Sequence, residues 1–412
     1  MTYCDLTYIE GGVTAPTGIR AVGAHLGFRK DPERLDTALV VADGPHASSA
    51  AVFTQNKFCA APVQVSRKVR EGKRGRAVLL NSGIANAATG NPGIMTAVRS
   101  AELCAQALDL SDDEVFVAST GVIGVSLPLE PFETGMGTLV EGLTDEGGHA
   151  AAQAIMTTDT HPKECAFTFE VAGATYHIGG MCKGSGMISP NMATMLAVIA
   201  TDCPVESASA QTALKAAVDV SFNKVTVDSD TSTNDSVFFL SSGAVGDAVA
   251  AQGVPGLESE LFEALSAALD ALCQNLARQI AADGEGATKL VTVNVRGAKD
   301  EADADLAART VANSPLVKTA IAGHDCNWGR IAAALGRSGA TFEQEDVDID
   351  IMEMPVLRDG LPVAFDEDEA LKRFEQDEIV IDVDLGQGEA ETSIWTCDLT
   401  HEYIHINADY RS

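Results

Sequence analysis

The feature that most constrains this chain is a glycine-rich turn at residues 183–194, with the sequence KGSGMISPNMAT, which ends against an apolar run. Gly184 and Gly186 loosen the backbone, and Pro190 fixes a turn within the segment. The apolar run that follows predicts a buried element, which would hold Thr194 in place at its start. The sequence therefore predicts a threonine fixed between a tight turn and the core.

A hydroxyl held on such a turn can attack the preceding carbonyl. Cleavage between Ala193 and Thr194 would free a new amine beside that hydroxyl. The product is an N-terminal nucleophile, in which the amine serves as the base for its own hydroxyl. A free α-amine has an ordinary pKa of about 7.7–8.0, close enough to ambient pH for that task. Spacing alone leaves a second interpretation open, a structural turn that leads into a core helix over residues 195–200.

The segment is similar, almost residue for residue, to the cleavage motif of the ornithine acetyltransferase family, the glutamate N-acetyltransferases of arginine biosynthesis. Further blocks resemble the same family and occur in family order from near the start of the chain to its last residues. These blocks are 81–83 with 86–90, 119–124, 156–160, 228–235, 284–289, 327–330 and 407–410. One block is weak support, whereas the ordered set extends the resemblance over most of the chain.

Two positions depart from the family pattern. Ile84 stands where the family usually has a polar residue, and Ser229 stands where it usually has glycine. Neither falls on a residue to which we assign chemistry, although Ile84 is close enough in sequence to reshape a wall near the site.

The length and the order of elements predict a two-domain α+β or layered α/β protein. At 412 residues the chain is long enough for two packed domains. The resemblance implies an αββα-type sandwich related to the β-peptidyl aminopeptidases, followed by a smaller α/β domain. We place the boundary near residue 285, which gives a catalytic domain over 1–285 and a second domain over 286–412.

Hydrophobic periodicity locates individual elements. The clearest is a helix over 257–280, in which leucines and alanines recur on one stripe. Other helices are predicted at 92–108, 204–220 and 300–311 and from residue 328, and strands at 115–118, 225–227, 237–240, 290–295, 347–351 and 379–383.

Charge and cysteine usage exclude several classes of protein. A net charge of −31 argues against nucleic-acid binding, because a phosphate backbone would be repelled. No apolar run is long enough to span a membrane, and the N-terminus lacks the pattern of a signal peptide, so we expect a cytoplasmic protein. Nine cysteines without zinc spacing predict free thiols and no metal site.

The turn at Thr120 and Gly121 is the candidate for stabilising charge in the transition state. A hydroxyl and a backbone N–H at a glycine can both donate to an oxyanion. The residues alone leave a strand-ending turn as the alternative, and the resemblance implies that this pair is the family's oxyanion hole.

The resemblance also implies a set of substrate contacts. Lys183 is suited to hold an α-carboxylate, and Glu285, between two glycines, is suited to the ammonium group of ornithine. Thr160, Asn407 and Ser412 match the family's remaining contacts. Because Ser412 is the last residue, the tail is expected to fold back over the pocket.

Together these residues imply a ping-pong enzyme. Thr194 takes the acetyl group from N2-acetyl-L-ornithine, L-ornithine leaves, and the amine of L-glutamate attacks the acetyl-threonine to give N-acetyl-L-glutamate. No cofactor is implied, and the sequence leaves the use of acetyl-CoA as a second donor open. The two fragments are expected to form an α2β2 heterotetramer. An N-terminal-nucleophile amidase or aminopeptidase on the same fold, and a binding protein without activity, remain as alternatives.

Overall fold

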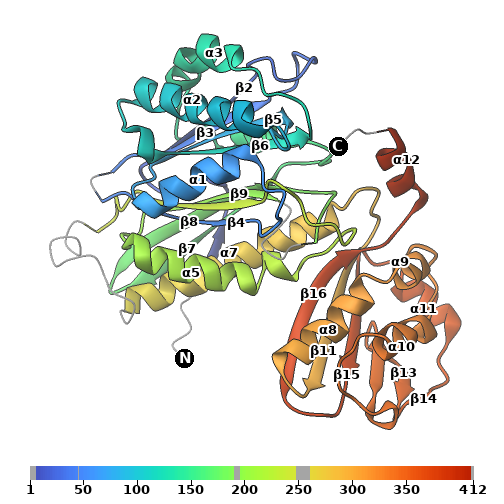
Figure 1. The fold of residues 1–412 in the computed structure, drawn as a ribbon. Helices are drawn as coiled ribbons and strands as arrows, with labels where there is room; N and C mark the ends of the chain where they lie inside the picture. Colours follow the sequence, from blue (N-terminus) through green and yellow to red (C-terminus); the bar gives the residue numbers. More distant parts are fainter. Residues whose placement is uncertain (1–5, 45, 190–194, 247–259, 410–412) are drawn as a thin grey trace.

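The computed structural model describes residues 6–44, 46–189, 195–246 and 260–409. Their strands form three sheets, of six, six and four strands. Helices cover these sheets, so the chain is a mixed α/β protein (Figure 1). This confirms the predicted fold class.

The four-stranded sheet carries helices on its outer face. Its order is β2-β3-β5-β6, and β5 and β6 run parallel. Its strands are β2 (Ile19–Ala24), β3 (Thr37–Ala42), β5 (Ala77–Ile84) and β6 (Val115–Val122). The covering helices are α1 (Ala61–Gly72), α2 (Gly90–Leu108) and α3 (Glu130–Glu141), with the short η1 (Asp112–Glu114) leading into β6.

The first six-stranded sheet is covered by two further helices, and its order is β1-β7-β8-β9-β10-β4. Its strands are β1 (Thr7–Ile9), β4 (Ser48–Phe53), β7 (Lys163–Val171), β8 (Ala174–Lys183), β9 (Leu196–Thr201) and β10 (Ser236–Ser241). The helices are α5 (Ser207–Asp219) and α7 (Glu260–Ala282), with η2 (Phe222–Lys224) after α5. The apolar stripe of α7 packs with Phe169 and Ile199 in one core cluster.

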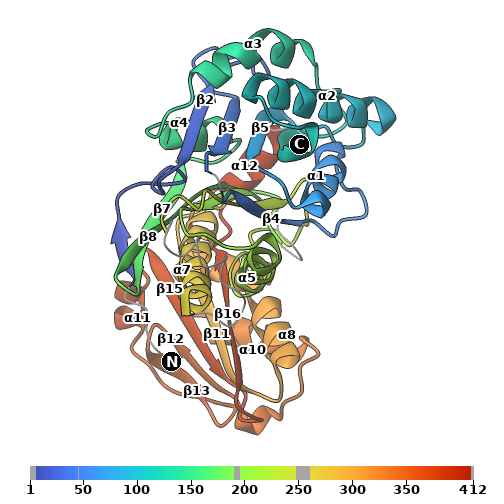
Figure 2. The same cartoon turned by 90° about the vertical axis from the view of Figure 1, so that its left-hand side faces the viewer.

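The inner faces of these two sheets pack against each other. Because side chains alternate along a strand, Leu79 of β5 points toward the helices whereas Val78 and Leu80 point toward the second sheet. Val198 of β9 and Phe238 of β10 meet them from that sheet. The layers are therefore helices, sheet, sheet and helices, which is the αββα sandwich that the resemblance implied (Figure 1, Figure 2). The short α4 (Gly148–Ala154) packs beside β2 and β3.

The third sheet is formed entirely by the last part of the chain, in the order β14-β13-β12-β15-β11-β16. Its strands are β11 (Leu290–Ala298), β12 (Asp348–Ile351), β13 (Met354–Arg358), β14 (Leu361–Pro362), β15 (Glu378–Asp384) and β16 (Ala390–Cys397). The associated helices are α8 (Glu301–Ala312), α9 (Pro315–Ala322), α10 (Trp328–Gly336) and α11 (Glu367–Arg373), with η3 (Gln344–Asp346) before β12. The division of the chain near residue 285 stays a prediction.

Side-chain caps explain where the helices of this last part begin. Asp300 accepts a hydrogen bond from the backbone of Asp303 at the start of α8, and Ser314 caps α9 in the same way. Asn327 caps α10, so that the helix begins at Trp328 as predicted. Each cap supplies an acceptor to an N–H that has no partner within its helix.

Two sequence interpretations are wrong. Residues 225–227 form no strand, because the amides of Thr226 and Val227 bond to two different segments, at Trp395 and Ile188, rather than along one neighbour. The apolar run after residue 194 is strand β9 rather than a core helix. Both faces of β9 are covered in the sandwich, and such a strand needs apolar residues on both sides, which gives the same continuous run as a buried helix.

The last helix, α12 (His401–Asp409), leaves the third sheet and lies beside the sandwich (Figure 2). The hydroxyl of Thr400 donates to the carbonyl of Gly286 over 2.6 Å just before it begins. A Cβ on Gly286 would lie 2.5 Å from the backbone nitrogen of Tyr403, so glycine permits this close approach. The C-terminal segment therefore returns toward the end of α7.

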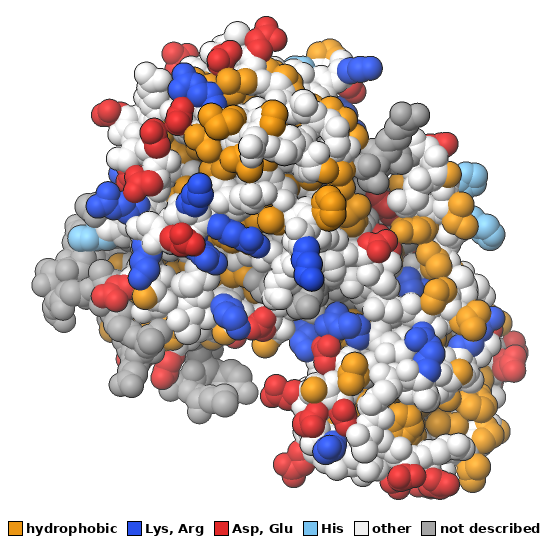
Figure 3. Space-filling view, viewed as in Figure 1, with side chains coloured by type: hydrophobic (Ala, Val, Ile, Leu, Met, Phe, Trp, Pro, Cys, Tyr) orange, Lys and Arg blue, Asp and Glu red, His pale blue; other side chains and the backbone are white. Residues whose placement is uncertain are grey.

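The charged side chains of one face are shown in Figure 3. On the face shown in Figure 3, acidic side chains are scattered over the rim, and basic ones lie mostly across the middle. This distribution is typical of a solvated acidic surface. Within the described residues, no helix is both long enough and apolar enough to cross a membrane.

Candidate active site

Five of the predicted site residues line one cavity. Thr120, Gly121, Lys183, Glu285 and Asn407 surround a space of about 190 Å³ between the ends of β6 and β8, the loop after α7, and α12. The other lining residues are Ala85, Ile123, Thr157, Thr158, Gly186, Met187, Asp228, Asp230, Ser232, Thr233, Asn234 and Tyr403. Segments far apart in the sequence thus bring five of the predicted site residues to one cavity.

The remaining predicted residues differ in their placement. Thr160 does not line this cavity, and its hydroxyl and amide are instead held by Asp283. Ala193, Thr194 and Ser412 lie outside the described residues. Ile84, one of the two departures from the family pattern, is absent from the cavity lining and packs against the core beside α2 and α3.

The end of β6 requires glycine at residue 121. Gly121 has φ of 127°, and a Cβ there would lie 2.3 Å from the carbonyl carbon of Gly83 on the paired strand. No side chain fits such a contact, and the positive φ is itself unfavourable for other residues. The cavity wall at Thr120 and Gly121 therefore depends on glycine at residue 121.

The buried side-chain amide of Asn234 bonds to the backbone on either side of this turn, and sequence reasoning assigned it no role. The side chain of Asn234 donates to the carbonyls of Ala85, over 2.6 Å, and Ser119, over 2.8 Å. The hydroxyl of Ser119 in turn donates to Asn81 over 2.6 Å. Asn234 thus joins the ends of β5 and β6. The signal in the sequence was its place in the family block 228–235.

Lys183 brings a cation to the cavity from the end of β8. Only 7% of its surface is exposed, and its ammonium lies 3.8 Å from a carboxylate oxygen of Asp159. Burial disfavours the ionised form of Asp159, but Lys183 and Lys163 hold the pKa of that carboxyl well below its usual range. The region around Lys183 therefore contains a compensating negative charge.

Glu285 brings a carboxylate from the loop after α7. Its backbone N–H donates to the carbonyl of Ser185 over 2.8 Å, which ties the loop to the glycine-rich turn. One carboxylate oxygen accepts a hydrogen bond from the side chain of Asn407 over 2.7 Å. A Cβ on Gly186 would lie 2.3 Å from the carboxyl carbon of Glu285. This contact gives a steric reason for one glycine of the turn.

Asp228 fixes the backbone that leads into the predicted cleavage site, and sequence reasoning missed it too. Its carboxylate accepts from the amides of Met187, over 2.6 Å, and Ile188, over 2.8 Å. The hydroxyl of Tyr403 donates to the same carboxylate over 3.3 Å. Burial raises the pKa of Asp228, and burial together with Asp228 raises the pKa of Tyr403. Asp228 thus links the glycine-rich turn to α12.

A larger hollow, of about 750 Å³, lies between the end of α5, the side of α7 and the third sheet. None of the predicted site residues lines it, so its size does not make it the candidate site. Within the described ranges, no group of three or more His, Cys, Asp or Glu residues is placed to hold a metal ion.

Comparison with known proteins places nearly the whole chain in the family that the sequence motifs resemble. The model of the ArgJ family matches residues 20–412. The chain belongs to the ArgJ family. It is 47% identical over 408 residues to the arginine biosynthesis bifunctional protein ArgJ of Symbiobacterium thermophilum, covering 99% of this chain and 100% of that protein. The ArgJ protein of Dehalococcoides mccartyi is 44% identical over 402 residues, 97% of each chain.

Solved structures of the family resemble parts of the chain. The ornithine acetyltransferase of Mycobacterium tuberculosis complexed with ornithine is 41% identical and covers 45% of this chain and 99% of that chain, with a TM-score of 0.43. The ArgJ protein of Bacillus halodurans is also 41% identical, and covers 52% of this chain and 98% of that chain, with a TM-score of 0.49.

Family membership decides between the functional alternatives. The chain is an acyltransferase of arginine biosynthesis of the bifunctional ArgJ type, which confirms the predicted enzyme class. The alternative functions, as an amidase, an aminopeptidase or a binding protein without activity, are therefore set aside. The roles of individual site residues stay predictions.

Proposed function

We propose that the chain transfers an acetyl group from N2-acetyl-L-ornithine to L-glutamate through Thr194. The hydroxyl of Thr194 attacks the acetyl carbonyl while the free amine of the same residue takes its proton. The bond between the acetyl carbon and the substrate nitrogen then breaks, and L-ornithine leaves with that proton. The amine of L-glutamate attacks the acetyl ester, and N-acetyl-L-glutamate leaves as the threonine hydroxyl is restored.

Thr120 and Gly121 are the proposed donors to the oxyanion in each step. The supporting observation is that no side chain fits at Gly121, while Asn234 holds the ends of β5 and β6 next to it. Donors that do not need to reorganise during the reaction stabilise the developing charge most effectively.

Lys183, Glu285 and Asn407 are the proposed contacts for an amino acid with two charged ends. The lysine and the glutamate reach one cavity from different elements, and Asn407 bonds directly to Glu285. The presence of an ammonium and a carboxylate in one cavity is the observation that carries the proposal. An amino acid with two charged ends needs both groups for binding, whereas water as the acceptor needs neither. Thr160 and Ser412 are proposed to contribute at the margin of the site.

Several further properties are proposed for the whole protein. Cleavage between Ala193 and Thr194 gives two fragments, which assemble as an α2β2 heterotetramer in the cytoplasm. The catalytic domain spans residues 1–285 and the smaller domain spans 286–412. Because two relatives at 47% and 44% identity are named bifunctional proteins, acetyl-CoA is proposed as a second acetyl donor. An assay of glutamate acetylation with acetyl-CoA as sole donor tests this last point.

The central test is mass spectrometry of the acetylated enzyme. Wild-type protein incubated with N-acetylornithine and no glutamate is expected to gain one acetyl mass on the first residue of the 194–412 fragment. Addition of glutamate should remove it. The Thr194→Ala variant should show neither cleavage nor transfer. An acetyl group on another residue, or transfer by Thr194→Ala, contradicts the proposal.

A further inference from the structure

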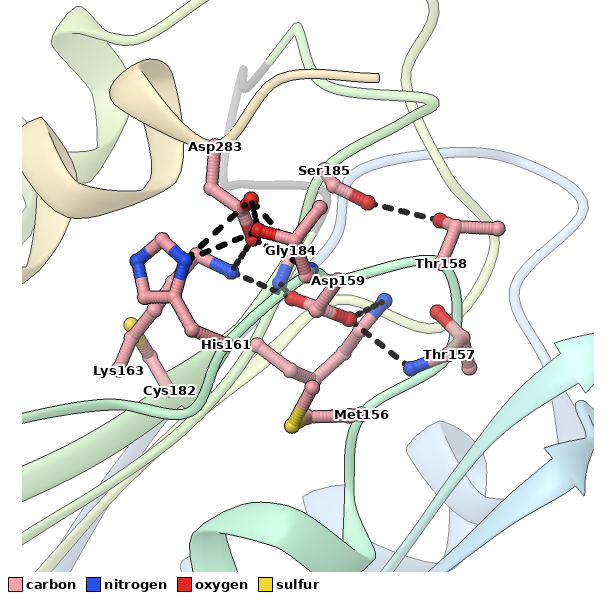
Figure 4. A network of polar contacts seen from close by, with 12 residues as sticks. Met156, Thr157, Thr158, Asp159, His161, Lys163, Cys182, Gly184, Ser185 and Asp283 are labelled. Carbon is pink, nitrogen blue, oxygen red and sulfur yellow. Dashed lines mark hydrogen bonds and ion pairs between the residues drawn. The ribbon is translucent and has the colours of Figure 1, made fainter. Parts of the chain in front are cut away.

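A buried triad of charges lies beside the site, and the reaction outlined above does not use it. The ammonium of Lys163, at the start of β7, lies 2.7 Å from Asp159 and 2.5 Å from Asp283 (Figure 4). The side chain of Lys163 has no exposed surface, and that of Asp283 has 3%. Burying three charges together is costly unless each finds close partners. Such a group therefore calls for an explanation beyond stability.

Both carboxylates of the triad also hold parts of the site. Asp159 accepts hydrogen bonds from the backbone of Gly184, over 2.7 Å, and Thr157, over 2.9 Å. Asp283 accepts from the amide and the hydroxyl of Thr160. Lys163 thus connects the loop before β7, the end of α7 and the first glycine of the glycine-rich turn.

Asp159 is shared between two lysines that differ in access to the cavity. Lys183 lines the cavity, whereas Lys163 does not, and Lys183 lies farther from Asp159, at 3.8 Å against 2.7 Å. Burial alone would lower the pKa of Lys163, but Asp159 and Asp283 raise it above its ordinary value. Lys163 is therefore charged at neutral pH and supplies the close partner that Asp159 needs.

Removal of Lys163 would change the partner of Asp159. A buried carboxylate without its cation attracts the nearest remaining one, and Lys183 is the other lysine whose charge acts on it. The ammonium of Lys183 would then move from 3.8 Å into direct contact with Asp159. An ammonium bound in this way is less available to a carboxylate that enters the cavity.

We propose that Lys163 is a positioning residue, which satisfies Asp159 at close range and thereby keeps the ammonium of Lys183 at its longer distance of 3.8 Å, where it can bind the substrate carboxylate. This inference rests on the proposed function, since it requires Lys183 to contact substrate. Lys163 itself touches no substrate. Its effect is on binding, so it should appear in KM rather than in kcat.

The test compares Lys163→Met with Lys215→Met, which removes a lysine from an exposed ion pair on α5. For N-acetylornithine, Lys163→Met should raise KM about tenfold and change kcat less than about threefold, whereas Lys215→Met should leave both unchanged. Both constants are measured on protein whose cleavage has been verified by intact mass. An unchanged KM in folded, cleaved Lys163→Met overturns the inference.

A second variant separates positioning from general destabilisation. In the double variant Lys163→Met with Asp159→Asn, the charge that would capture Lys183 is gone, so KM should return to within about threefold of wild type. Asp159→Asn also removes an unpaired buried charge and so relieves a purely structural defect, which is why the deciding measurement is the KM of folded, cleaved protein rather than its stability. A double variant with a KM as high as the single one therefore overturns the inference. If the single variant does not fold, a double variant with near wild-type KM supports it, and a tenfold rise overturns it.

Lys183→Met distinguishes failure of this inference from failure of the proposed function. If Lys183→Met leaves KM for N-acetylornithine unchanged, the proposed role of Lys183 is wrong, and the inference falls with it. If Lys183→Met raises KM but Lys163→Met does not, the proposed function stands and only the positioning role of Lys163 is wrong.

Discussion

The carboxyl group of Glu285 lies directly over Gly186, where a Cβ would come within 2.3 Å of its carboxyl carbon. The glycine-rich turn is thus shaped by a residue that comes about a hundred positions later in the sequence. Glu285 is only 8% exposed and also bonds to Asn407, so its side chain has little room to move aside. Gly186 and Glu285 both line the candidate cavity.

We expect Gly186→Ala to displace the carboxylate of Glu285. Because the proposed contact to the ornithine ammonium is lost, kcat/KM for N-acetylornithine should fall by about tenfold or more. The control is Gly137→Ala on α3, where an added Cβ meets nothing within 4 Å. Steady-state kinetics of both variants check this prediction. Equal kcat/KM in the two variants would show that Glu285 does not contact the substrate.

Thr120→Ala should slow transfer while leaving substrate binding close to wild type. One oxyanion donor is lost and the N–H of Gly121 remains, so we expect kcat to fall by about a hundredfold or less. Thr212→Ala, on the exposed side of α5, serves as the matched control. Single-turnover measurement of acetyl-enzyme formation checks the prediction directly. A wild-type rate would make Thr120 an ordinary turn residue.

The parts of the site that sequence predicted are those in short local motifs. The pair Thr120 and Gly121, the turn with Gly186, and Glu285 each stand in a block of consecutive residues with a distinctive composition. The resemblance supplied their roles, and the cavity brings the described ones together. Local composition is sufficient to predict such positions, because close contacts at Gly121 and Gly186 require glycine in the sequence itself.

The supporting residues could not be predicted in this way. Asn234, Asp228 and Lys163 act through partners more than 30 positions away in the sequence or on another strand, such as Ser119 and Asp283. Their residue types are common in solvated loops, and only burial shows that they are used. Strand β9 illustrates the same limit for the fold, since a strand covered on both faces and a buried helix share an unbroken apolar run.

The backbone at Ser229 adopts a conformation that favours glycine, the residue that the family usually has at this position. Its φ is 68°, in the left-handed region, and its side chain is exposed. Ser229→Gly should therefore stabilise the protein by about 0.5 kcal/mol, because relief of the Cβ clash exceeds the extra chain entropy of glycine. Glu343→Gly, at an exposed residue with φ of −100°, should instead destabilise. Thermal unfolding of both variants measures whether Ser229→Gly gains stability and Glu343→Gly loses it. A loss of stability in Ser229→Gly would contradict the strain argument.

Asp235 lies next to Met195, the residue that follows the predicted nucleophile Thr194 in the sequence. It is 2% exposed, and its carboxyl accepts hydrogen bonds from the side chain of Ser232 and from the backbone of Met195. Its Oδ2 atom has no hydrogen-bond partner within the described part of the chain. Burial raises the pKa of this carboxyl well above its ordinary value, although the hydrogen bonds and the charge of Lys183 oppose the shift.

This shift makes stability fall as pH rises. The folded state binds the proton of Asp235 more tightly than the unfolded state, so the folded protein is favoured at low pH. That advantage is lost between the ordinary carboxyl pKa and the raised one, by about 1.4 kcal/mol for each pH unit inside that window. Asp235→Asn keeps a similar shape and cannot ionise. We therefore expect the free energy of unfolding of Asp235→Asn, minus that of wild type in the same cleavage state, to increase as pH rises through the window.

The matched control is Asp112→Asn, which neutralises an exposed carboxylate on the surface turn before β6. An exposed charge is solvated in both the folded and the unfolded state, so no growing difference is expected from it. Denaturant titrations at several pH values, from mildly acidic to mildly basic, measure both variants. If Asp235→Asn and wild type keep a constant difference across this range, the carboxyl of Asp235 is ionised throughout, and its burial must be compensated by a cation closer than Lys183.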